Sequence, residues 1–140
     1  MSFETDPSIH KRLEAWIKEK GVSEIELILP DMNGIIRGKV VPAARFLKGV
    51  SNHTLRIASS ILRVTVTGEY PDAESDDEDG FSGTLDPDCV LVPDPASICV
   101  APGYRTPTAY VVTDAYTHAG KLIDIAPRQV LRRVLDLYAE

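Results

Sequence analysis

Long hydrophobic runs are absent from this 140-residue sequence, and their absence excludes several kinds of protein. No apolar stretch approaches the roughly 20 residues that a membrane-spanning helix requires. The first residues, MSFETDPSIHKR, also lack the apolar centre of a secretory signal. We therefore expect a cytoplasmic protein with no membrane partner.

Positive charge is scarce as well. The chain has 15 Lys and Arg against 21 Asp and Glu, which gives a formal net charge of -6. A protein that binds nucleic acid needs clustered basic residues to displace counterions from phosphates, so we expect no nucleic-acid partner. The most acidic stretch, residues 72–79, predicts a solvated loop, with attraction of cationic polyamines as a weaker alternative.

The residues from which active sites are usually built are few. The two cysteines, Cys89 and Cys99, lack the spacing of metal ligands, so we expect two buried free thiols and no metal site. The nine glycines form no phosphate-binding loop. His10, His53 and His118 stand beside no nucleophile motif and are interpreted as exposed side chains. We expect no catalytic residue within this chain.

What the sequence does contain is a clear alternation of elements. Asp6 and Pro7 predict the start of an amphipathic helix that Gly21 ends. Alternating and β-branched stretches predict strands at 24–29, 35–41, 61–67, 89–92, 97–100 and 108–113, with a short helix over 43–48 stopped by Gly49. Asn33-Gly34 is typical of the tight turn between the first two strands. The order predicts an α+β fold, a mixed sheet with helices on one side.

A last helix is predicted from Pro127, with Val130, Leu131, Val134, Leu135 and Tyr138 on one face. No terminating Gly or Pro follows this apolar face. We expect the helix to continue into a further domain, with Val130, Val134 and Tyr138 partly uncovered in this chain.

Three segments, in order, carry a family resemblance. Residues 29–39 (LPDMNGIIRGK), 86–95 (DPDCVLVPDP) and 127–135 (PRQVLRRVL) are similar to motifs of the N-terminal β-grasp domain of the glutamine synthetase family. The resemblance covers roughly residues 22–140. It implies a helix at 1–21, a β-grasp domain at 22–126, and at 127–140 the start of the helix that leads to an absent catalytic domain.

The resemblance implies an enzyme whose chemistry lies outside these 140 residues. Members of the family use ATP and Mg²⁺ or Mn²⁺ to join glutamate to ammonia or an amine through γ-glutamyl phosphate. Their metal ligands belong to the catalytic domain, so this domain alone is expected to bind no cofactor and to be inactive. By resemblance it completes the active site of a neighbouring subunit in a ring-shaped homo-oligomer.

The part of the domain that reaches that site is, by resemblance, a loop that reads Phe-Asp-Gly-Ser-Ser in ammonia-using members. Here it reads Arg-Ile-Ala-Ser-Ser, and Ile57 replaces the aspartate that helps to bind ammonium. The loop is closer to that of the γ-glutamylpolyamine synthetase branch, although ammonia stays open as acceptor. Ser59, Ser60 and Arg63 are the candidates for contact with substrate; for the two serines, a role in shaping the loop is equally compatible with the sequence.

A different class of function is also compatible with the sequence. The chain could be a free-standing β-grasp interaction module that acts without catalysis. The unterminated apolar helix at the C-terminal end favours the ligase domain over this module.

Overall fold

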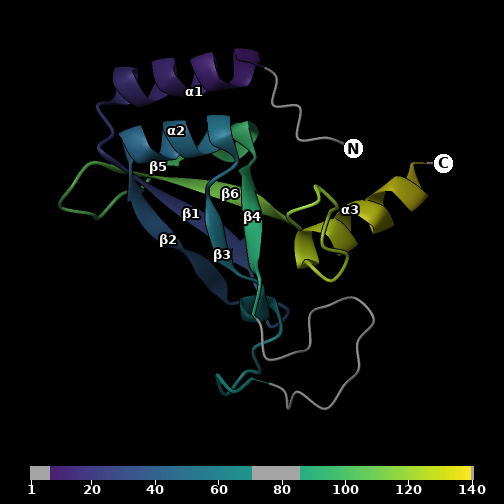
Figure 1. Cartoon of the computed structure of the whole chain (residues 1–140). Helices are drawn as coiled ribbons and strands as arrows, with labels where there is room; N and C mark the ends of the chain where they lie inside the picture. The colour runs from purple at the N-terminus through teal and green to yellow at the C-terminus, as the bar shows by residue number, and fades with distance from the viewer. Residues whose placement is uncertain (1–6, 71–85, 140) are drawn as a thin grey trace.

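The computed structural model describes residues 7–70 and 86–139 (Figure 1). The elements follow the order α1 (Pro7–Lys20), β1 (Glu24–Pro30), β2 (Ile36–Pro42), α2 (Ala43–Asn52), β3 (Arg56–Ala58), η1 (Ser59–Leu62), β4 (Asp88–Pro93), η2 (Pro95–Ser97), β5 (Cys99–Val100), β6 (Thr108–Tyr116) and α3 (Pro127–Tyr138), where η marks a 3-10 helix. Asp6, the predicted N-cap, and the acidic stretch 72–79 lie outside the described residues.

The strands form one mixed sheet in the order β2-β1-β6-β4-β3. β1 and β6 run parallel, and the other pairs run antiparallel. β6 is the central strand, because its second half pairs with β4 and its first half with β5. β4 and β5 therefore pair with the same side of β6, with η2 between them, and the predicted strand at 97–100 shortens to two residues.

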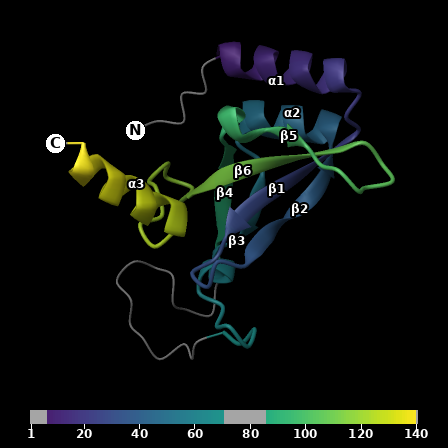
Figure 2. The same ribbon diagram turned by 180° about the vertical axis from the view of Figure 1, so that it is seen from behind.

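Two helices cover one face of the sheet. α2 lies against β1 and β2, and α1 lies alongside α2 (Figures 1 and 2). The alternation in β1 turns three side chains toward these helices, Ile25, Leu27 and Leu29, which are at most 1% exposed. Leu13 of α1 and Phe46 of α2 complete the same core. Each such side chain contributes about 1.5–3 kcal/mol by leaving water, so this layer holds the α+β fold together.

The opposite face of the sheet has no described helix over it. The strand register places Val40, Glu26, Tyr110 and Cys99 in one row across this face. The Tyr104 hydroxyl donates a 2.6 Å hydrogen bond to the Glu26 carboxylate, which raises the pKa of Tyr104 to about 12. Val40 and Tyr104 are nearly half exposed, so this open face is partly apolar.

The predicted strand at 61–67 is wrong. The chain forms its strand earlier, as β3, and then turns through η1, where the Arg63 N–H donates to the Ser60 carbonyl. Leu62 and Val64 are buried two residues apart, which imitates the alternation of a strand. The backbone beyond them closes a local turn, in which the Thr65 N–H bonds the Glu69 carbonyl, and does not join the sheet.

Two smaller predictions were also wrong. Gly49 does not stop the second helix but lies buried within α2, where an added Cβ would sit 2.5 Å from the Leu55 side chain. The helix runs on to a left-handed cap at His53. Cys99 is exposed, since it points to the open face, whereas Cys89 is buried and burial raises the pKa of its thiol to about 11.

α3 projects from the end of β6, away from α1 and α2 (Figures 1 and 2). Its first residue is the predicted Pro127. Within residues 7–70 and 86–139, no helix combines the length and apolarity needed to cross a bilayer.

Candidate functional site

The three predicted substrate-loop residues lie close together at one end of the sheet. Ser59 and Ser60 begin η1 directly after β3, and Arg63 follows its last residue. We call residues 56–64 the serine loop. Ser59 is 2% exposed, whereas Ser60 and Arg63 are half-buried.

Both serines are bonded to one carboxylate from another segment. Asp86 lies two residues before β4 and accepts a 3.0 Å bond from the Ser60 N–H and a 2.5 Å bond from the Ser60 hydroxyl. The Ser59 hydroxyl makes a longer contact of 3.5 Å with the same carboxylate. The serines thus shape the loop, and their hydroxyl protons are directed toward Asp86.

The first hairpin holds the serine loop at both ends. The Lys39 ammonium donates to the Arg56 carbonyl at the start of the loop. The Asn33 side-chain amide donates a 2.7 Å bond to the Val64 carbonyl at its end. Residues that the sequence motif placed in a turn and a strand therefore position a segment some 20 to 30 positions away in the chain.

Asp31 fixes the shape of that hairpin. Its side chain is fully buried and accepts bonds of 2.8 and 2.9 Å from the N–H groups of Asn33 and Ile35, and 2.9 Å from Arg37 Nε. Burial acts to raise the pKa of the Asp31 carboxyl, but these hydrogen bonds outweigh it and hold the pKa below its ordinary value. The bonds from Asn33 and Ile35 are those of a carboxylate that closes its own turn, in agreement with the turn predicted at Asn33-Gly34.

Ile57 occupies the position at which the resemblance expects an ammonium-binding carboxylate. It pairs with Cys89 across the β3–β4 ladder and packs against the hydrophobic core. Its side chain therefore supports the loop from within, and no charge stands at this position. The carboxylate to which the serines bond is Asp86, which is exposed.

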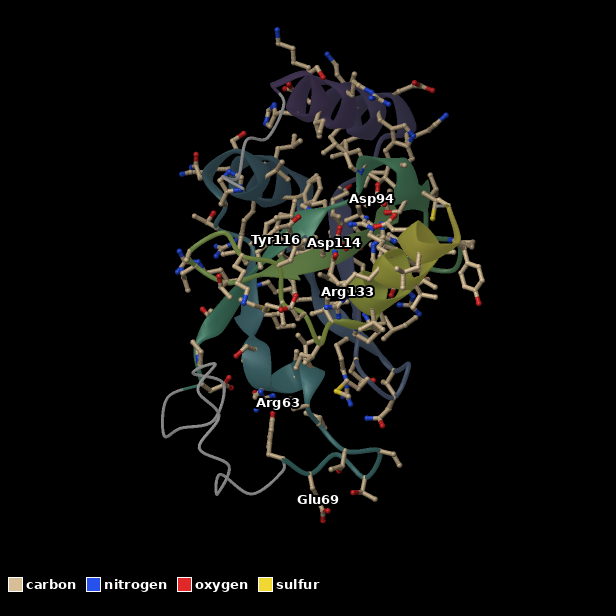
Figure 3. All side chains as sticks on the ribbon, turned by 90° about the vertical axis from the view of Figure 1, so that its right-hand side faces the viewer. Arg63, Glu69, Asp94, Asp114, Tyr116 and Arg133 are labelled. Atoms are coloured by element: carbon tan, nitrogen blue, oxygen red, sulfur yellow. The ribbon has the colours of Figure 1, made fainter. Side chains whose placement is uncertain are left out.

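A second polar cluster was missed by sequence reasoning. Arg128 Nε donates 2.9 Å to Asp114, Arg132 Nη1 donates 2.8 Å to the same carboxylate, and Arg128 also bonds Asp94. Figure 3 shows Asp94 and Asp114 beside α3, with Arg63 apart at the loop end. Burial, with Asp114 nearby, raises the pKa of Tyr116. The four-residue spacing of the two arginines was the available signal.

The chemistry open to this arrangement is limited. Among the described residues no group of three His, Cys, Asp or Glu side chains could hold a metal ion. The serine loop offers a shaped wall beside two exposed carboxylates, Asp86 and Asp88, and the first hairpin of the same domain bonds both ends of the loop. Such a wall suits a composite site whose reacting groups come from elsewhere.

Comparison with known proteins agrees with the resemblance in the sequence. The chain is 30% identical over 139 residues to the gamma-glutamylethanolamide synthetase of Streptomyces coelicolor, and 27% identical over 138 residues to a glutamate–isopropylamine ligase of a Pseudomonas species. The alignments cover 96% and 97% of this chain but 28% of each relative. The chain thus spans just over a quarter of the length of these relatives. No protein-family model matches it.

Solved structures share the fold. The ADP complex of GmaS superposes with a TM-score of 0.68 at 23% identity, covering 91% of this chain and 25% of that chain. A glutamine synthase homolog gives 0.67 at 20% identity, covering 84% and 27%. In both, the matched part is about one quarter of a longer protein.

Proposed function

Since this chain is an N-terminal domain of the glutamine synthetase family, we propose that it completes the active site of an ATP-dependent ligase that joins glutamate to an amine. In this proposal the serine loop forms one wall of a site in a neighbouring subunit of a ring-shaped homo-oligomer. ATP and Mg²⁺ or Mn²⁺ are held by the catalytic domain, and the enzyme works in the cytoplasm.

The observation that carries the proposal is the orientation of α3. Its arginines face the sheet and bind Asp114, whereas its apolar residues point outward. Six large apolar side chains of this helix are 42 to 86% exposed: Val130, Leu131, Val134, Leu135, Leu137 and Tyr138. An exposed apolar face of this kind, in a chain that spans 28% of its relatives, supports a catalytic domain as its cover.

The acceptor in this proposal is an organic amine rather than ammonia. Ile57 packs into the core and offers no charge for ammonium. The two relatives are named for ethanolamide formation and for isopropylamine, both of which contain carbon chains on nitrogen. Polyamines belong to the same substrate class.

The test is made on the native protein purified from its source cells. We expect an intact mass several times the 15.3 kDa of this chain, and ADP release that requires glutamate together with an amine. Isopropylamine, ethanolamine, putrescine and ammonium chloride are compared at equal concentration. Ammonium as the best acceptor would overturn the amine assignment, and a native mass of 15.3 kDa would favour a free-standing interaction module.

A further inference from the structure

At position 57, where the resemblance expects a carboxylate, the serine loop has an isoleucine. A carboxylate from another segment, Asp86, nevertheless contacts the loop. Asp86 belongs to a different segment, yet both of its carboxylate oxygens lie against Ser60, at 3.0 Å from the N–H and 2.5 Å from the hydroxyl. From the proposed function of the loop, we infer that Asp86 is the group that attracts the cationic ammonium of the amine substrate.

The choice of Asp86 rests on access and orientation. Asp31, another carboxylate at this end of the sheet, is fully enclosed and already bonded to Arg37, whereas the exposed Asp88 pairs with Ala58 in the strand ladder. Asp86 is exposed, and the bonds from Ser60 fix the direction of its carboxylate. An ionised carboxylate has about four lone-pair sites, so the contacts with the two serines leave room for a further donor.

The inference explains how the loop can bind an amine although position 57 is apolar. A carboxylate within about 4–6 Å favours the charged form of an amine and concentrates it at the site. Ile57 meanwhile fills the core beneath the loop. Asp86 determines the preference for a cationic acceptor, while the choice of an alkylamine over ammonia rests on the proposed function.

The experiment uses Asp86→Asn in the ligase that contains this domain. Asn keeps an acceptor for the Ser60 N–H and a partner for the Ser60 hydroxyl, so it removes the charge and retains the loop. The matched control is Asp88→Asn, which removes an exposed carboxylate two residues further along. Hydrogen exchange at the Ser60 amide and the thermal midpoint verify that both variants keep the loop.

We expect Asp86→Asn to raise KM for isopropylamine by about fivefold, while KM for glutamate and for ATP stays unchanged, since a partly exposed ion pair contributes about 1 kcal/mol. KM for hydroxylamine, an acceptor that is uncharged at neutral pH, is expected to stay as it was. A purely structural role would raise KM for both acceptors alike.

Equal KM values for isopropylamine in Asp86→Asn and Asp88→Asn would overturn the inference, as would a matching rise for hydroxylamine. Either result would leave amine-dependent ADP release by the wild-type enzyme intact. Absence of that release in the wild type would instead overturn the proposed function. The two failures are thus separate.

Discussion

Gly38 is a position at which the backbone leaves no room for a side chain. Its φ is +148°, and an added Cβ would lie 1.7 Å from the Leu27 carbonyl oxygen of the paired strand. Backbone cannot move aside as a flexible side chain can, so β1 and β2 would have to separate. At the scale of single residues, therefore, this glycine is required by close approach between strands as well as by φ.

Gly38→Ala is expected to cost more than about 4 kcal/mol or to prevent folding, because it breaks the hairpin that holds the serine loop. Gly34→Ala is the matched control, since Gly34 has φ +77° and nothing within 4 Å of an added Cβ. It is expected to cost about 1–2 kcal/mol. Urea unfolding followed by circular dichroism measures both, and equal losses would contradict the close approach.

Asp31 gives the fold a defined dependence on pH. Its pKa is lower in the folded chain, so the folded state binds fewer protons than the unfolded state. The resulting stability is complete above the unfolded pKa of about 3.9 and is lost as pH falls through the folded pKa. Asp31→Asn is expected to lower the free energy of unfolding at pH 7 by about 1.5–3 kcal/mol, the usual worth of bonds to a charged group.

Urea midpoints between pH 2 and pH 7 measure this contribution. The difference between wild type and Asp31→Asn is expected to narrow below about pH 4, because protonation removes the same charge from the wild type. Asp88→Asn, at an exposed position, serves as the control. If the difference in urea midpoint between wild type and Asp31→Asn stays constant down to pH 2, the ionised Asp31 carboxylate contributes nothing to the free energy of unfolding.

At the scale of elements, α3 is held by charge rather than by apolar packing. Asp114 is 7% exposed and receives both Arg128 and Arg132. Asp114→Asn would leave two arginines to share Asp94, at a cost of about 2 kcal/mol. We expect faster hydrogen exchange in α3 with unchanged exchange in β1. Asp124→Asn, an exposed partner of Arg133 at 3.7 Å, is expected to change neither element.

The elements also show what the sequence could and could not predict. Local signals sufficed for α1, β1, the Asn33-Gly34 turn and the start of α3, because propensity and burial agree there. They failed at 61–67, where local backbone bonds close turns and Asn33 bonds the Val64 carbonyl from another segment. Contacts with distant segments help to determine the conformation of such a segment, and a local sequence pattern does not indicate these contacts.

The candidate site could be predicted only in part, because the sequence reports local patterns but not contacts between distant segments. Ser59, Ser60 and Arg63 were proposed from the resemblance and lie in one loop, and their contact with substrate stays a prediction. The role of Asp86 was not visible, because 26 positions separate it from Ser60 and its own neighbourhood is typical of a turn. The Lys39 contact with Arg56 was likewise hidden by an ordinary strand pattern.

At the scale of the whole molecule, a closed apolar core contrasts with two surfaces on which large apolar side chains are uncovered. Beneath α1 and α2 the core is complete, with Phe46 and Leu62 fully buried. The open face of the sheet and the outer face of α3 expose large apolar side chains, with Ile36 64% exposed and Tyr138 86% exposed. Contiguous surfaces of this kind are typical of interfaces between domains or subunits.

The 140-residue chain by itself is therefore expected to self-associate through α3. Sedimentation should give an average mass that rises above 15.3 kDa with concentration. The paired change Leu131→Glu and Leu135→Lys places opposite charges four residues apart on the outer face, which preserves the helix and opposes association. Glu14→Lys with Lys18→Glu makes a comparable exchange on the exposed side of α1. If α3 is the contact, the first pair restores the mass of a single chain and the second does not; equal masses in the two variants would place the association on the open face of the sheet.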